Sequence, residues 1–224
     1  MKIYAHRGSS GEYPEMTRLA YEKAIEDGAD GFECDVRLTK DREIACIHDR
    51  DTARISGTKT KVSKSNLQTL KKSASIITLN ELLDVAIKNR KNLLIETKHP
   101  VPTGGTIEKK VLALLHTRSD EISKSGIEII CMSFSWFAVQ RFSKAWESCT
   151  VSKYYWQTWL SQTQSIAISI DLLLKYPKLI NRLKLRGKRI FVWTVNSQNH
   201  LTLCREFEID GVITNYPKRA KING

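Results

Sequence analysis

The sequence contains no long apolar segment. No stretch approaches the ~20 apolar residues that a membrane-spanning helix needs, and residues 1–6 already look like ordered sequence rather than the start of a signal peptide. We therefore expect neither secretion nor stable membrane insertion. Internal repeats and low-complexity blocks are also absent. With 41% hydrophobic and 27% charged residues, the composition is that of an ordinary globular protein, so we expect one domain spanning residues 1–224.

Cysteine is sparse and scattered. The five residues are odd in number and include no Cys-x-x-Cys pair, which argues against a disulfide framework and against a thiolate zinc site. They are Cys34, Cys46, Cys131, Cys149 and Cys204. Reduced thiols in a cytoplasmic protein are the simplest interpretation.

Acidic residues are few compared with basic ones, 24 against 36, which gives a formal net charge of +12. This charge favours anionic partners, such as nucleic acid, acidic lipid surfaces or phosphorylated small molecules. The basic residues are spread out, with five lysines in residues 59–72 and seven lysines and arginines in residues 175–189. Solvated helices and loops explain them most simply. We find no nucleic-acid-binding motif, so we expect no specific nucleic-acid partner.

Short apolar, β-branched runs alternate with longer stretches that are compatible with helices, a pattern typical of parallel βα units. The eight predicted strands span residues 2–6, 31–36, 92–98, 128–133, 151–155, 166–171, 189–195 and 211–215. Eight such runs indicate a barrel. The predicted helices span residues 16–27, 79–88, 107–115, 136–146, 175–185 and 198–207. Residues 157–165 are too short and polar a stretch to predict a helix.

A ninth run, residues 43–48, follows the second strand too closely for a crossover helix. We therefore expect it to return as an antiparallel hairpin strand, with residues 39–42 as its turn. Residues 49–75 are polar and rich in lysine and have no strong period, so we interpret them as a surface insertion rather than a second domain.

Two carboxylates, Glu33 and Asp35, lie at positions i and i+2 of a strand, which points both side chains to the same side. Glu96 lies in a second apolar strand, where a charged side chain needs a partner. From spacing alone, an ion network with Arg7 or Arg37 would be the simpler explanation. Three carboxylates without cysteine could also bind a hard cation, for which Mg²⁺ or Ca²⁺ fits better than zinc.

Two histidines favour the metal interpretation. His6 and His48 each end an apolar run, and active-site groups of α/β barrels occupy the ends of strands. A pair of histidines beside a metal-bound phosphate supplies the general base and general acid that phosphodiester hydrolysis requires. Arg7 is a candidate phosphate ligand through its bidentate guanidinium. The other histidines, His99, His116 and His200, lack this context, and we expect surface or packing roles for them.

An ordered series of motifs resembles the glycerophosphodiester phosphodiesterase family over nearly the whole chain. Any single motif is weak evidence, but the complete series in the family's order is specific. The motifs are Ala5-His6-Arg7-Gly8, Tyr13-Pro14-Glu15-Met16-Thr17, Glu33-Cys34-Asp35-Val36, Leu38-Thr39-Lys40-Asp41, Ile47-His48-Asp49, Ile95-Glu96-Thr97-Lys98, Ser133-Phe134, Val192-Trp193-Thr194-Val195-Asn196 and Asp210-Gly211-Val212-Ile213-Thr214-Asn215-Tyr216-Pro217.

The resemblance implies an α/β fold, a single (β/α)₈ TIM barrel with a β-hairpin extension and a short insertion after the second barrel strand. It also implies metal-dependent hydrolysis of glycerophosphodiesters, such as glycerophosphocholine or glycerophosphoethanolamine, to glycerol 3-phosphate and an alcohol, a step of glycerophospholipid catabolism. One divalent cation is expected, Mg²⁺ or Ca²⁺, with Mn²⁺ as another possibility.

By position, the motifs assign a role to each site residue. The acid/base pair is His6 and His48, the metal ligands are Glu33, Asp35 and Glu96, and the residues near the phosphate or glycerol are Arg7, Lys98, Trp193 and Glu15. The resemblance does not fix the role of Glu15, and core packing is an equally good explanation for Trp193.

Two positions depart from the family's pattern. Met16 stands where the family usually has Asn, and Arg42 stands in the hairpin turn where Gly is usual. Without Gly, we expect a turn that avoids positive φ. The short insertion suggests an open site that accepts small, water-soluble diesters.

Two other functions stay possible from the sequence. A lipid hydrolase of the sphingomyelinase or phospholipase D type would share the barrel, the two histidines and the acidic site. A non-catalytic protein that binds phosphate or nucleic acid would explain the net charge but not the histidines and carboxylates together.

Overall fold

Eight parallel strands form a closed barrel in the computed structural model, which describes residues 1–101 and 103–222. β1 closes the ring by pairing with both β2 and β9. The short strand β3 pairs antiparallel with β2 outside the ring. The strands are β1 (Lys2–His6), β2 (Gly31–Leu38), β3 (Ile44–Cys46), β4 (Asn92–Thr97), β5 (Ile129–Ser133), β6 (Ser148–Ser152), β7 (Ser165–Ser169), β8 (Arg189–Trp193) and β9 (Gly211–Thr214). The predicted (β/α)₈ barrel with its hairpin extension is confirmed.

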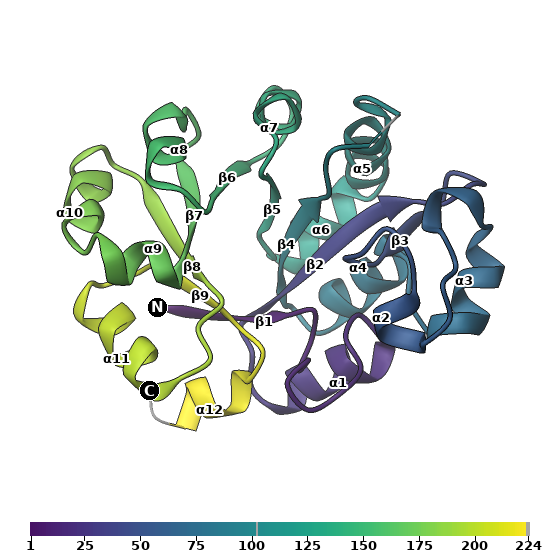
Figure 1. Ribbon diagram of the computed structural model, residues 1–224, viewed down its shortest axis with the longest axis horizontal. Helices are drawn as coiled ribbons and strands as arrows, with labels where there is room; N and C mark the ends of the chain where they lie inside the picture. The colour runs from purple at the N-terminus through teal and green to yellow at the C-terminus, as the bar shows by residue number, and fades with distance from the viewer. Residues whose placement is uncertain (102, 223–224) are drawn as a thin grey trace.

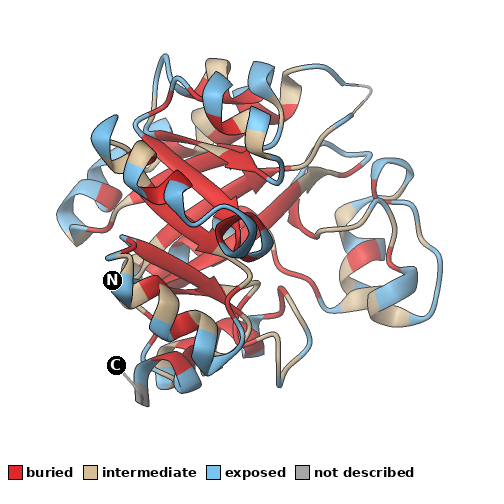
Figure 2. Ribbon diagram, turned by 60° about the vertical axis from the view of Figure 1, so that its left-hand side comes forward, coloured by how far each residue is buried: buried red, intermediate tan, exposed pale blue. Residues whose placement is uncertain are grey.

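Helices surround the barrel, with buried residues facing the strands and exposed residues facing solvent (Figures 1 and 2). They are α1 (Arg18–Glu26), α2 (Ala53–Ser56), α3 (Leu67–Ala74), α4 (Leu79–Lys88), α5 (Thr106–Thr117), α6 (Ser119–Ser125), α7 (Trp136–Phe142), α8 (Tyr155–Leu160), α9 (Ile170–Lys175), α10 (Lys178–Leu185), α11 (Gln198–Glu206) and α12 (Pro217–Ile222), with the 3₁₀ turn η1 (Val62–Lys64). The predicted cap at Thr78 is confirmed, since its side chain and that of Glu81 form a capping box. Among the described helices, none has the length and apolarity needed to cross a bilayer.

The two faces of each strand pack into different cores. Inside the barrel, Tyr4 and Phe191 meet edge to face at 5.7 Å between ring centroids, within a cluster that also contains Leu94 and Ile213. Alternate residues point outward under the helices, and Cys34 belongs to this outer cluster. This alternation turns its neighbours Glu33 and Asp35 toward the barrel interior, as the spacing predicted.

Several predicted element bounds differ from the structure. β7 ends at Ser169 rather than residue 171, and α7 ends at Phe142 rather than residue 146. β6 ends at Ser152 rather than residue 155, because the aromatic residues that follow it form the N-terminal end of α8. Residues 157–165, for which no helix was predicted, therefore contain the second part of α8. The helix expected over residues 175–185 starts after Pro177, which separates α9 from α10.

The insertion at residues 49–75 contains α2, η1 and α3 and lies at the right-hand edge of Figure 1. Val62 and Leu70 pack with Ala45 and Ile47 of the hairpin in a small core of their own. The prediction that the hairpin turn avoids positive φ is wrong, because Arg42 has φ of 62°. Arg42 thus has the left-handed conformation that Gly adopts easily, although its Cβ makes this conformation sterically unfavourable.

Candidate active site

Parallel register brings the three predicted carboxylates together at the carboxyl end of the barrel. His6 is level with Glu33 across β1 and β2, and Asp35 is level with Glu96 across β2 and β4. One oxygen from each of the three carboxylates lies within 4.8 Å of the others, and all three residues are buried. Among the described residues this is the one group whose side chains could hold a metal ion.

Two cations partly neutralise this cluster. Arg7 Nε lies 2.9 Å from Asp35 Oδ2, and Lys98 Nζ lies 3.1 Å from Asp35 Oδ1 and 2.5 Å from Glu96 Oε1. Burial alone would raise the pKa of Asp35, but the charges of Arg7 and Lys98 lower it, so this carboxylate stays ionised. The Arg7–Asp35 ion pair considered from the sequence is therefore present, whereas Arg37 donates to the carbonyl of His48 instead.

The cluster nevertheless fits a further cation. Glu33 Oε2 is buried without a hydrogen-bond partner, and Asp35 Oδ2 has only the ion pair with Arg7, which is not aligned as a hydrogen bond. Burial and the charge of Asp35 raise the pKa of Glu33, and the same two causes raise the pKa of Glu96 to about 7. Oxygen ligands that repel one another and lack donors are the environment that a hard divalent cation stabilises.

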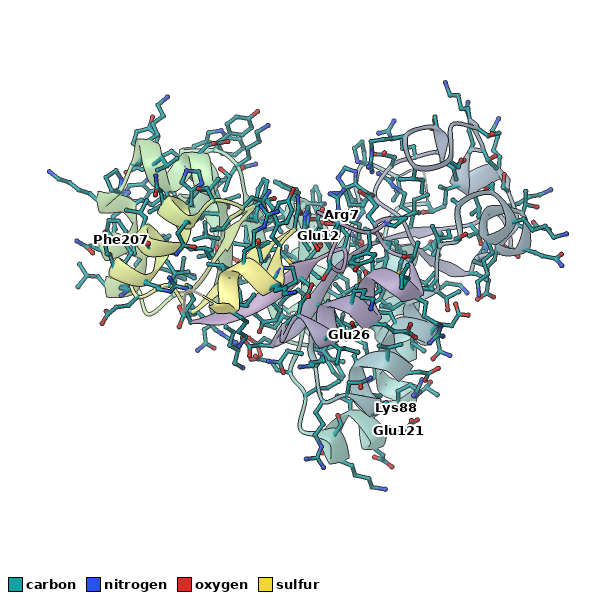
Figure 3. The ribbon with its side chains drawn as sticks, turned by 90° about the horizontal axis from the view of Figure 1, so that it is seen from below. Arg7, Glu12, Glu26, Lys88, Glu121 and Phe207 are labelled. Atoms are coloured by element: carbon teal, nitrogen blue, oxygen red, sulfur yellow. The ribbon has the colours of Figure 1, made fainter. Side chains whose placement is uncertain are left out.

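Arg7 is held by an unusual loop backbone. Arg7 and Met16 both have positive φ, 59° and 56°, and Met16 N donates to Arg7 O at 2.9 Å. Gly8 follows Arg7 with φ of 82°, and a Cβ there would lie 2.7 Å from the backbone of Ala20. The loop thus turns the Arg7 side chain toward the carboxylates, and Arg7 lies in the middle of Figure 3, between the insertion and the C-terminal half of the barrel.

An asparagine from the far end of the chain orients His6. The ring Nδ1 lies 2.6 Å from Asn215 Oδ1, which also accepts a hydrogen bond from Ser10 Oγ at 3.2 Å. Because Oδ1 is an acceptor, Nδ1 carries the proton and Nε2 keeps its lone pair, 3.8 Å from Glu33 Oε2. Burial and the charge of Arg7 lower the pKa of His6 to about 4, so the ring is neutral.

A carboxylate orients His48. Asp49 Oδ1 lies 2.7 Å from His48 Nδ1, which leaves Nε2 for another partner. The His48 side chain is 33% exposed, against 18% for His6. The pKa of His48 is lowered by burial and by the charges of Arg7 and Lys98, although the charge of Asp35 and the hydrogen bond to Asp49 oppose this shift. The two histidines therefore differ in exposure and in orienting partner: His6 is enclosed and held by an amide, and His48 is more open and backed by a carboxylate.

The insertion contributes one residue that connects the two sides of the site. Arg54 of α2 donates to both oxygens of Glu15, at 2.9 and 2.7 Å, and to Asp49 Oδ2 at 2.6 Å. Glu15 also forms an ion pair with Arg7 at 3.3 Å. Burial would raise the pKa of Glu15, but the hydrogen bonds and charges of Arg54 and Arg7 lower it. Glu15 thus lies beside the site, as predicted, in a bridge from Arg54 to Arg7.

Two aromatic residues line the edge of the site. Trp193 is half-buried and meets Phe134 edge to face at 5.6 Å between ring centroids. Lys98 Nζ lies 5.8 Å from the Phe134 ring centroid. The indole of Trp193 donates to the carbonyl of Ala167 at 3.2 Å, which fixes its ring. Trp193 therefore both packs against its neighbours and lies at the edge of the site.

Asp49, Arg54 and Asn215 were not selected as site residues from the sequence. Asp49 and Asn215 lie inside motifs that carried the resemblance, and a carboxylate directly after a candidate catalytic histidine was an available signal. Arg54 gave no signal, because it lies in a polar insertion. Of the other histidines, His99 pairs with buried Glu108 at 2.6 Å, a contact that holds the β4–α5 connection.

Comparisons with known proteins show the family of the chain. The family model described as the glycerophosphoryl diester phosphodiesterase family matches residues 6–219. The chain is 32% identical to a Mycobacterium tuberculosis protein named "Probable glycerophosphodiester phosphodiesterase 1", over 98% of this chain and 90% of that protein.

Solved structures give the same result for the fold. A glycerophosphodiester phosphodiesterase from Thermotoga maritima superimposes with a TM-score of 0.82 at 27% identity, covering 97% of this chain and 95% of that one. An Oleispira antarctica phosphodiesterase, solved with its product sn-glycerol 3-phosphate, has a TM-score of 0.83 at 21% identity and covers 100% and 96%. The chain belongs to the glycerophosphoryl diester phosphodiesterase family and is a phosphoric diester hydrolase.

Proposed function

We propose that this enzyme hydrolyses glycerophosphodiesters to glycerol 3-phosphate and an alcohol, and that it needs a divalent cation to do so. The observation that carries the proposal is the joint placement of three buried carboxylates, two cations and two oriented histidines at one end of the barrel. The product bound to the Oleispira antarctica structure supports glycerol 3-phosphate as the product here.

Glu33, Asp35 and Glu96 would hold the cation, for which Mg²⁺ or Ca²⁺ fits an all-oxygen site and Mn²⁺ is also compatible. When bound, a divalent cation polarises the phosphoryl group and neutralises charge that develops on its oxygens. Arg7 and Lys98 act on the same charge from the protein side, Arg7 through its planar guanidinium and Lys98 as a point charge. Trp193 provides an aromatic wall for the glycerol.

The proton transfers follow from the orientation of the histidines. His6 is neutral with a free Nε2 lone pair, so it acts as the general base that removes a proton from the nucleophile, either water or the glycerol 2-hydroxyl. His48 is more exposed and is backed by Asp49, so we assign it as the general acid that protonates the departing alkoxide. It must then enter the step as the imidazolium, the form that the charge of Asp35 and the hydrogen bond to Asp49 favour. Phosphorus forms one bond to the nucleophile oxygen and loses one to the alcohol oxygen, while His6 gains a proton and His48 loses one. Water as the nucleophile gives glycerol 3-phosphate directly. The glycerol 2-hydroxyl gives a five-membered cyclic phosphate, which water then opens to glycerol 3-phosphate with His48 as the base and His6 as the acid.

Two alternatives receive less support. Lipid hydrolases of the sphingomyelinase type are typically secreted and disulfide-bonded, whereas all five cysteines here are free and buried. The free thiols also support the proposed cytoplasmic location. A protein that only bound phosphate would gain nothing from two histidines with separate orienting partners.

The test is release of glycerol 3-phosphate from a panel of glycerophosphodiesters, after EDTA treatment and add-back of Mg²⁺, Ca²⁺ or Mn²⁺. We expect EDTA to abolish turnover and at least one ion to restore it. The variant Asp35→Asn, assayed in parallel, should stay inactive with every ion. Absence of turnover under every metal, together with DNA binding whose affinity falls steeply with salt, would instead support the nucleic-acid-binding alternative.

A further inference from the structure

A group of exposed apolar side chains lies on one side of the barrel. We call this group the aromatic rim; it consists of Phe134, Trp136, Phe137, Tyr154, Trp156, Trp159 and Leu160. Phe137 is 67% exposed and Trp156 60% exposed. Three of the five tryptophans of the chain belong to it. Single exposed apolar residues are ordinary on protein surfaces, but contiguous groups of this kind mark interaction sites.

The rim is one surface and is continuous with the active site. Its residues follow β5 and β6, two neighbouring strands, and belong to α7, α8 and the connections before them (Figure 1). Trp136 and Trp159 line the same hollow between these helices. At its inner end, Phe134 touches both Trp193 and the ammonium of Lys98. Anything bound to the rim therefore lies beside the mouth of the barrel.

α8, which carries Trp156, Trp159 and Leu160 of the rim, is held in place by Arg182 and Arg186. The Arg182 guanidinium stacks on the Trp159 ring at 3.7 Å from its centroid and donates to the Tyr155 hydroxyl at 2.7 Å. Arg186 donates to the carbonyl oxygens of Thr158 and Ser161, at 3.2 and 3.3 Å. These contacts hold α8 in place while its aromatic rings stay in solvent. A rigid platform loses little side-chain entropy when it binds a partner.

The charge around the rim indicates which partner fits. Three basic residues border the rim. Arg182 stacks on Trp159, Arg186 lines the hollow with Trp136 and Trp159, and Lys153 directly precedes Tyr154. Lys153 is exposed, and it forms no ion pair within residues 1–101 and 103–222. A second copy of this chain would place positive charge against positive charge, whereas an anionic surface would be attracted.

We propose that the aromatic rim docks on an anionic phospholipid bilayer, with the rings of Trp156 and Phe137 entering the headgroup region and Lys153 facing the lipid phosphates. Tryptophan and tyrosine rings prefer this interface because they are apolar with one polar edge. Lysines near the surface add attraction to anionic lipid. Docking in this orientation turns the mouth of the barrel toward the bilayer surface. The proposal concerns binding and is independent of the proposed reaction.

The experiment is sedimentation of the full chain with vesicles of phosphatidylcholine, with and without phosphatidylglycerol. We expect binding to the anionic vesicles, weaker binding as salt rises, and a blue shift of tryptophan fluorescence on binding. The double variant Phe137→Ser/Trp156→Ser should lower the partition coefficient by about tenfold per ring. The variant Lys153→Gln should lower it by about fivefold, which corresponds to about 1 kcal/mol.

The matched control is Leu19→Ser, which removes an exposed apolar residue from α1, on the opposite side of the barrel in Figure 1. It should bind vesicles like the unaltered protein, and circular dichroism should show that all variants are folded. No binding to anionic vesicles would overturn the proposal, as would equal binding by the aromatic double variant. A dimer in sedimentation velocity that this variant loses, without vesicle binding, would assign the rim to a second copy.

Discussion

Replacing His48 by alanine should have an effect that depends on the alcohol that leaves. If His48 protonates the alkoxide, its loss should slow hydrolysis of glycerophosphocholine by about 10³, in the middle of the range for general acid catalysis and equal to about 4 kcal/mol of activation free energy. A p-nitrophenyl ester of glycerophosphate releases a stable phenolate that needs no proton. For that substrate, His48→Ala should lose less than about tenfold.

His6→Ala is the matched comparison. The base acts on the nucleophile, which is the same for both substrates, so this variant should lose about 10³ on each. The assay measures kcat/KM for both substrates with saturating metal, using glycerol 3-phosphate release in one case and nitrophenolate absorbance in the other. If His6→Ala lost little activity on the nitrophenyl ester while His48→Ala lost about 10³ on it, the assignment of His6 as the base and His48 as the acid would be refuted. Near-normal turnover in both variants would refute the mechanism itself.

The remaining predictions concern the metal site, the insertion and the hairpin. Glu33→Gln should weaken Mg²⁺ binding in calorimetry by at least about 100-fold. It should not lower the melting temperature of the metal-free protein, because burial and the charge of Asp35 already disfavour the ionised form of Glu33. Unchanged affinity would exclude Glu33 as a ligand. Arg54→Ala should reduce kcat/KM by about tenfold, whereas Lys59→Ala in the same insertion should not; equal effects would mean that the bridge to Glu15 is unimportant. Arg42→Gly should raise the free energy of unfolding, measured in urea, by about 0.5–1 kcal/mol, because Gly adopts positive φ without steric strain. The control Lys40→Gly, at a position where φ is not positive, should lower it. A loss of stability in Arg42→Gly would show that contacts of the arginine side chain outweigh its backbone strain.

The architecture could be predicted from the sequence because strand periodicity and spacing are local. Alternation alone placed Glu33 and Asp35 on one side of their strand and Cys34 on the other, and the structure confirms it. The short interval before residue 43 was enough to predict an antiparallel return. Boundaries were less accurate where composition misled. Tyr154 and Tyr155 have the high β-propensity of strand residues, yet they lie at the start of α8.

Backbone conformation at single residues was less predictable than the strands. Arg42, Arg7 and Met16 all have positive φ although none is Gly or Asn. Residue type gives only a statistical preference for or against positive φ, and tertiary contacts override this preference. At Met16, the hydrogen bond from its amide to Arg7 O holds the turn, and its apolar side chain is buried. The amide that the family usually has at this position is therefore not needed for the turn to form.

The partners of the two histidines mark the limit of inference from local sequence. Asn215 lies 209 residues from His6, and only closure of the barrel between β9 and β1 brings them to 2.6 Å. Arg54 reaches Glu15 across 39 residues from a segment whose polar composition indicated no more than a surface insertion. Strand ends and the family's motifs could thus select the candidate side chains, but the groups that set their tautomers and charges come from elements that meet only in the folded barrel. Those groups are where substitutions should alter the rate without altering the residues that contact substrate.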